Sequence, residues 1–161
     1  MDGTDFRIEE PVPFDRKWYS HKFNGPGLRY EVAVSIQCAD IVWVNGPYPC
    51  GEWPDLRIAQ NAIIYEVDEG EFLLADGGYN DGSNYMETPN GLNNEDQRQK
   101  ALVRARHENL NRCFKEFHSL SHRFRHPLHK HGLVAHSVTR IVQVKIREGE
   151  IIPFYVEYYD G

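Results

Sequence analysis

The chain has 161 residues, of which 40% are hydrophobic and 12% aromatic, so it can bury a core and does not belong to the disordered class. No apolar run approaches the roughly 20 residues of a membrane-spanning helix, and the first residues have neither the basic nor the apolar part of a signal peptide. We therefore expect a single domain over residues 1–161, intracellular and without membrane contact.

The net charge of −6 hides an uneven distribution along the chain. Residues 1–97 contain 6 basic residues (Lys or Arg) and 18 acidic residues (Asp or Glu). Residues 98–147 contain 12 basic and 2 acidic residues, and residues 148–161 contain no basic and 4 acidic residues. A basic segment of this kind is typical of proteins that contact phosphate groups. The alternative is a solvated basic helix that balances the acidic part of the chain.

The first half of the chain is expected to form strands joined by turns, because β-branched and aromatic residues come in short runs between Gly, Pro, Asn and Asp. Residues 29–37 alternate between apolar and polar side chains, and residues 40–45 form a compact apolar run. Together they predict a hairpin that turns near residues 38–40.

A helix is predicted over residues 54–67, because a proline suits a first helical turn and Asp55 favours the positive end of the helix dipole. Residues 71–75 (EFLLA) are typical of a short buried strand, and two glycines after Asp76 allow the backbone to turn sharply. Residues 80–94 are polar and without periodicity, which predicts a loop.

Helical periodicity then runs from residue 95 to residue 124, where the apolar residues recur at steps of three and four. The predicted buried stripe consists of Leu110, Phe114, Phe117, Leu120 and Phe124. Glu108 falls on the opposite, polar face, which also carries Arg104, Arg112 and Lys115. Pro127 is expected to end this helix.

Two further elements are predicted beyond this proline. Residues 132–146 favour a second amphipathic helix, and residues 152–158 favour a last extended segment.

Three acidic residues stand where packing does not require them: Asp2 beside Gly-Thr, Asp76 after an apolar strand, and Glu108 on a helix. Cleavage of phosphodiesters with two metal ions needs carboxylates that converge on cations roughly 4 Å apart. Each acid also has an ordinary explanation. Asp2 could belong to a disordered terminus, Asp76 could be a turn residue, and Glu108 could form an ion pair with Arg112.

The order of the motifs resembles the Harbinger-type DDE transposases and related DDE superfamily endonucleases. The resemblance rests on DGTDFRI at the start, on PFDRKWYSHKFNGPGLRYEVAVSIQCADIVWVNGPYPCGEWPDL, on LLADGGY, and on RARHENLNRCFKEFHSL, and it covers nearly the whole chain. In that family the acids lie in D-G-T, in D-x-G-Y after an apolar strand, and on a helix before a lysine. These motifs match Asp2, Asp76, and Glu108 with Lys115.

The resemblance implies an α/β, ribonuclease H-like fold, a mixed five-stranded sheet flanked by helices, with the first strand truncated because Asp2 follows Met1 directly. It implies Asp2, Asp76 and Glu108 as catalytic residues and metal ligands, with Mg²⁺ or Mn²⁺ as the metal. Asp55 is a further candidate ligand; the alternative is a helix-end charge.

The resemblance also implies DNA as the partner and the nucleus as the location. Arg104, Arg112 and Lys115 would contact phosphates; the alternative is ion pairing with the acidic half. The predicted function is a metal-dependent DNA endonuclease or transposase core. The alternative is a truncated or domesticated remnant that binds DNA or protein without catalysis. The family normally carries a separate DNA-binding segment upstream, so we expect either that the gene model is truncated or that target choice depends on a separate DNA-binding partner.

Overall fold

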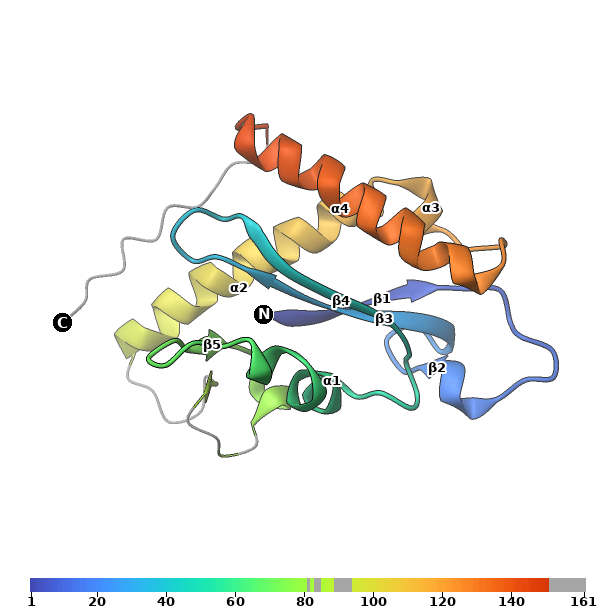
Figure 1. Ribbon diagram of the computed structural model, residues 1–161, viewed down its shortest axis with the longest axis horizontal. Helices are drawn as coiled ribbons and strands as arrows, with labels where there is room; N and C mark the ends of the chain where they lie inside the picture. Colours follow the sequence, from blue (N-terminus) through green and yellow to red (C-terminus); the bar gives the residue numbers. More distant parts are fainter. Residues whose placement is uncertain (81, 83–84, 89–93, 151–161) are drawn as a thin grey trace.

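The computed structural model describes residues 1–80, 82, 85–88 and 94–150. Figure 1 shows a sheet in the middle of the molecule with helices on both sides. Within the described ranges, no helix combines the length and the apolar character needed to cross a bilayer.

β3 (Gly25–Val34) is the central strand of the sheet, because β1 (Asp2–Arg7) and β4 (Ile41–Pro49) both pair with it. β2 (Tyr19–Ser20) pairs with its first residues, and all of these pairings are antiparallel. The hairpin predicted between residues 29–37 and 40–45 is confirmed by the pairing of β3 with β4.

Two short strands, β5 (Leu73–Leu74) and β6 (Met86–Glu87), form a separate parallel pair. β5 confirms the predicted strand over residues 71–75, although it is shorter. β6 lies within residues 80–94, so the loop predicted there was wrong at these two positions. Residues 81, 83–84 and 89–93 of that stretch lie outside the described residues.

α1 (Asp55–Asn61) is followed by a short 3₁₀ helix (Ile63–Tyr65), so the predicted helix over residues 54–67 is right in place but too long. The helix ends because Ala62 leaves the helical region, with φ −142° and ψ −82°.

The long helix predicted over residues 95–124 was wrong beyond Lys115. α2 (Asn94–Lys115) ends there, Phe117 adopts an extended conformation, and α3 (His118–Ser121) starts a new axis. The predicted end at Pro127 therefore comes after the helix has already stopped.

The second predicted helix, over residues 132–146, is confirmed by α4 (His131–Arg147). The predicted extended segment over residues 152–158 lies outside the described residues. With four α-helices and two sheets among the described residues, the α/β class is confirmed.

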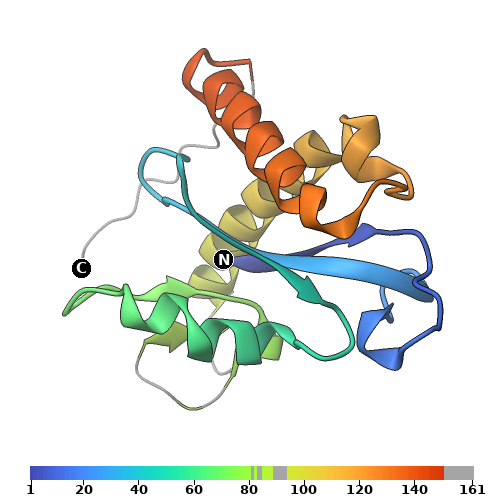
Figure 2. The ribbon, with the colours of Figure 1, turned by 45° about the vertical axis from the view of Figure 1, so that its right-hand side comes forward.

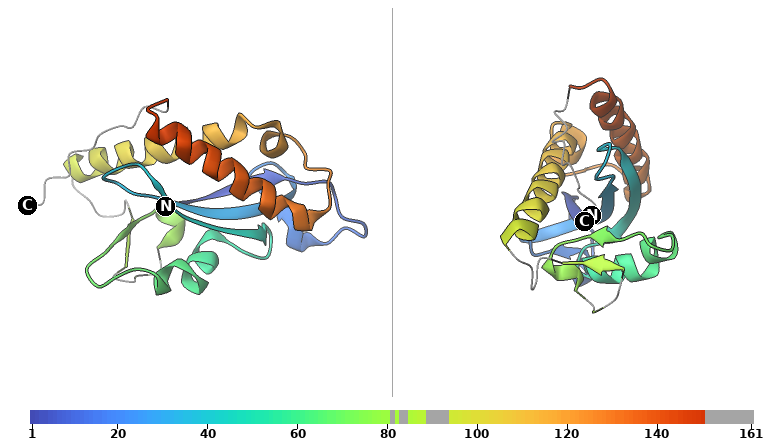
Figure 3. Two further views of the ribbon diagram at one scale, coloured as in Figure 1. Left: turned by 45° about the horizontal axis from the view of Figure 1, so that its top comes forward. Right: turned by 90° about the vertical axis from the view of Figure 1, so that its left-hand side faces the viewer.

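The sheet separates two apolar cores, and the alternation of β3 assigns its side chains to them. Figures 2 and 3 show α2 and α4 over one face, and α1 with β5 and β6 on the other side. The larger core, under α2 and α4, includes Phe6, Leu28, Tyr30, Val32, Leu110, Phe114, Leu120, Phe124, Val138 and Val142. The smaller core, beside α1, contains Met1, Ala33, Ala59, Ile63, Tyr79 and Met86.

Candidate active site

One cavity of about 560 Å³ is lined by the three acids that the sequence singles out. Asp2 comes from β1, Asp76 from the turn after β5, and Glu108 from α2. The fold therefore brings together residues that are more than 100 positions apart in the chain. The cavity lies between β1 and α2, because Asp2 and Thr4 of β1 and Arg104, Glu108 and Lys115 of α2 all line it.

Local hydrogen bonds hold two of these carboxylates. The Oδ1 atom of Asp2 accepts a hydrogen bond from the Gly3 amide at 2.8 Å. Asp76 is the N-cap of a 3₁₀ turn (Gly77–Tyr79), and its Oδ1 accepts from the Gly78 amide, also at 2.8 Å. Within the described chain, the hydrogen bonds of both carboxylates use Oδ1, which leaves each Oδ2 atom available to a ligand.

Asp2 lies in an environment that disfavours its charge. Burial raises the pKa of Asp2, and the nearby charge of Asp76 raises it further, whereas the ammonium of Lys22 acts in the opposite direction. Two carboxylates that repel each other in a partly buried cavity would gain from a cation between them.

The chemistry of the donors fits a hard divalent cation, because all three acids offer carboxylate oxygens, the ligands that Mg²⁺ and Mn²⁺ prefer. Their arrangement is more open than a finished metal site. Among the residues that the structure describes, no three His, Cys, Asp or Glu side chains are grouped closely enough to share one ion.

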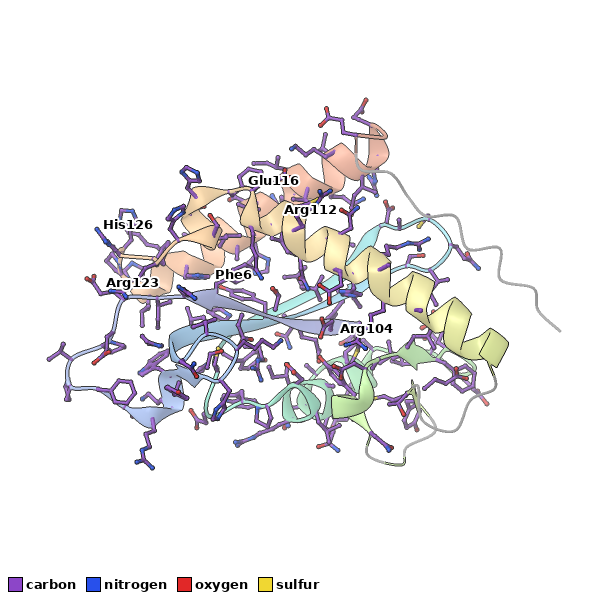
Figure 4. All side chains as sticks on the ribbon, turned by 180° about the vertical axis from the view of Figure 1, so that it is seen from behind. Phe6, Arg104, Arg112, Glu116, Arg123 and His126 are labelled. Atoms are coloured by element: carbon purple, nitrogen blue, oxygen red, sulfur yellow. The ribbon has the colours of Figure 1, made fainter. Side chains whose placement is uncertain are left out.

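Cationic side chains line the same cavity. Arg104 and Lys115 reach it from α2, Arg7 from β1, and Lys22 from the turn between β2 and β3. Figure 4 shows Arg104 and Arg112 on α2, with Arg112 nearer the α3 end. Arg112 does not line the cavity, and its guanidinium donates to Asn109 Oδ1 at 2.8 Å.

Asp55, the fourth predicted ligand, does not line this cavity. It lies in the first turn of α1, against Gly3 of β1. Its carboxylate forms an ion pair with Arg29, at 3.2 Å from Nε. Burial raises the pKa of Asp55, and the charge of Arg29 opposes that effect.

A buried ion pair, which the sequence did not reveal, supports β1 from the α1 side. Arg29 donates to Asp5 through Nε at 2.7 Å and through Nη2 at 2.9 Å, and Ser20 Oγ donates to the same carboxylate at 2.6 Å. Burial alone would raise the pKa of Asp5, but these hydrogen bonds hold it below its usual value. The pair ties β1 to β3 and β2 next to the cavity.

Sequence reasoning also missed Lys22 as a residue of the cavity. The available signal was its position in YSHK, which lies between the first two acidic motifs. The contact itself depends on the turn between β2 and β3, and no local pattern encodes it.

A family model of the DDE superfamily endonucleases matches residues 1–146 of the chain. The match covers most of the chain, including all three acids, so the protein belongs to the DDE superfamily endonucleases. No curated protein and no solved structure matches the chain.

Proposed function

We propose that this chain is the catalytic core of a DNA endonuclease or transposase that cleaves or transfers phosphodiester bonds with two divalent metal ions. The observation that carries the proposal is the single cavity lined by Asp2, Asp76 and Glu108. Membership of the DDE superfamily endonucleases supports the same reaction class.

In this mechanism Asp2, Asp76 and Glu108 would hold Mg²⁺ or Mn²⁺ through their carboxylate oxygens. The metal ions supply activation of the attacking oxygen and stabilisation of the leaving oxygen. The Gly3 and Gly78 amides donate to Oδ1 of the two aspartates, which leaves Oδ2 of each available to a metal ion.

Charge on the walls of the cavity suits a phosphodiester substrate. Arg104 and Lys115 line the cavity beside Glu108, and they would bind phosphates without reading base sequence. Arg112 would contact DNA outside the cavity. For Asp55 we favour support of β1 over metal binding, because its carboxylate contacts Arg29.

A ribonuclease H-like sheet is the fold that we infer for this core. Supporting it, the amino group of Met1 at the start of β1 donates to the carbonyl of Leu74 in β5. Because β5 pairs with β6, this contact is compatible with one mixed sheet in the order β4, β3, β1, β5 and β6.

The motif order further leads us to infer a Harbinger-type subgroup, a nuclear location, and a separate partner for target choice. The D-G-T at Asp2, the D-x-G-Y at Asp76 and the lysine after Glu108 are the features that support the subgroup.

A binding module without catalysis is the second candidate. The spacing of the acids favours it, since the described residues offer no preassembled group of three ligands. The two candidates differ in what a divalent cation does to the protein.

Binding of a cation separates them. In thermal unfolding, Mg²⁺ or Mn²⁺ should raise the Tm of the wild type, because a ligand that binds only the folded state stabilises it. Asp76→Asn should lose most of that shift. Equal shifts in both proteins, or none in the wild type, would favour the binding module.

A further inference from the structure

Lys22 lines the cavity from the turn between β2 and β3, whereas Arg104, Glu108 and Lys115 line it from α2. It lies two residues after the end of β2, and its Nζ donates a hydrogen bond to the Gly3 carbonyl at 2.7 Å. That carbonyl belongs to the residue after Asp2, so the ammonium is held beside the first acid. Lys22 lines the cavity together with Asp2, Asp76 and Glu108.

The backbone around Lys22 is fixed by buried groups. The Lys22 amide donates to Ser20 Oγ at 3.2 Å, and that hydroxyl donates to Asp5 at 2.6 Å. Asp5 is in turn held by the two hydrogen bonds from Arg29. This network restrains the backbone from which the exposed lysine side chain extends.

The charge of Lys22 remains available to an anion. In the part of the chain that is described, Lys22 forms no ion pair, although it acts electrostatically on Asp2, Asp5 and Asp55. An ammonium has three N–H donors, and the Gly3 carbonyl takes one of them. The other two can donate to oxygens in the cavity.

We propose that Lys22 is a phosphate-binding residue of the active site, whose ammonium binds a non-bridging oxygen of the DNA strand beside Asp2. With Arg104 and Lys115 on the α2 wall, the strand would then be held from both sides of the cavity. The inference rests on the proposed function, because it takes DNA as the substrate.

Binding of a fluorescein-labelled DNA duplex, measured by anisotropy in EDTA over a range of KCl concentrations, tests this contact without catalysis. Loss of one phosphate contact lowers the slope of log Kd against log salt by about 0.9. We expect this change in Lys22→Gln, together with roughly tenfold weaker binding at low salt. The loss should be equal for two duplexes of unrelated sequence, since phosphates carry no sequence information.

Lys22→Arg should keep the salt slope, because it keeps the charge. Lys17→Gln is the matched control: Lys17 lies in the same stretch, is exposed, pairs with Asp15 at 3.4 Å and does not line the cavity. A wild-type slope in folded Lys22→Gln, or an equal loss in Lys17→Gln, would overturn the proposal.

A measurement on the wild type covers the case in which Lys22→Gln does not fold. The duplex should protect the Lys22 amine from acetylation, as followed by mass spectrometry, while Lys17 stays reactive. An unprotected Lys22 would refute the contact. Because neither readout needs strand cleavage, a chain that binds through Lys22 but never nicks DNA would contradict the proposed function alone.

Discussion

Gly3, in the strand that carries Asp2, lies against Asp55 of helix α1. A Cβ atom built on Gly3 would lie 1.9 Å from Asp55 Oδ1 and 2.7 Å from its Cγ. The carboxylate could move away only by giving up its ion pair with Arg29. The glycine of the D-G-T motif therefore has a packing reason that is independent of any metal.

Gly3→Ala is expected to destabilise the protein by roughly 1–3 kcal/mol, the usual cost of overpacking. Gly77→Ala is the control, since a Cβ there meets no atom within 4 Å. Urea unfolding monitored by circular dichroism measures both. Equal stability of Gly3→Ala and Gly77→Ala would show that Asp55 gives way without cost.

At the residue scale, the family motifs predicted which acids share the cavity. They did not predict which other charged residues lie in the cavity and which lie outside it. Asp2, Asp76 and Glu108 follow from motif order. Asp55 was predicted as a further candidate ligand because the resembling family often carries an aspartate where the first helix begins. Its contact with Arg29 depends on which face of β1 meets α1, and the strand was too short in the sequence pattern to reveal that.

At the element scale, apolar side chains position the helices. Most side chains of the predicted apolar stripe are buried even though the predicted helix is interrupted after Lys115. The predicted stripe is right in that Leu110, Phe114, Leu120 and Phe124 are all buried. It was wrong in placing them on one helix, since α2 stops at Lys115 without a proline or glycine to signal the end. The spacing of apolar residues therefore predicted which side chains are buried. The direction of the chain after Lys115 is set by tertiary packing instead.

Phe124 shows this best, because its backbone bridges to β1 while its ring enters the core. Its amide donates to the Arg7 carbonyl at 2.9 Å, and its ring centroid lies 4.7 Å from that of His131.

Phe124→Ala should therefore cost about 3–5 kcal/mol in the free energy of unfolding, as for other buried phenylalanines. Phe14 is 47% exposed, so Phe14→Ala should have a much smaller effect in the same chemical denaturation experiment. If the two variants lose similar stability, the segment after α3 is not docked as described.

For the molecule as a whole, buried titratable groups make stability depend on pH. His107 is 5% exposed, and burial lowers its pKa to about 3. In the unfolded chain the pKa of this histidine is about 6.5. At pH values between about 6.5 and about 3, the unfolded chain binds a proton that the folded chain does not, so the free energy of unfolding falls as pH falls. Glu31 acts in the opposite sense, since burial raises its pKa to about 7.

A comparison of wild type with His107→Leu isolates the histidine, because Glu31 contributes equally to both proteins. Below about pH 6, the stability of the wild type relative to the variant should fall by roughly 1.4 kcal/mol per pH unit. Urea unfolding at pH 7, 6 and 5 measures this difference. A difference that does not change with pH would mean that the ring is hydrated and titrates normally.

The hairpin and the last helix could be predicted from local patterns, because alternation and helical period act over a few residues, whereas the α/β class was implied by the family resemblance. Local patterns could not predict that β1, the turn after β5 and α2 meet around one cavity, because this arrangement depends on packing between distant parts of the chain. Only the family motifs pointed to that long-range arrangement before the fold was known.

The central claim is that three distant acids act as one metal-dependent site, and nicking of supercoiled plasmid DNA with Mn²⁺ tests it most directly. The wild type should nick only when the metal is present, and Glu108→Gln should lose roughly a hundredfold in rate. Glu116→Gln should keep wild-type activity, because Glu116 lies outside the cavity and pairs with Lys145 at 3.5 Å. Nicking by Glu108→Gln at the wild-type rate, or no metal-dependent nicking by the wild type, would contradict the account.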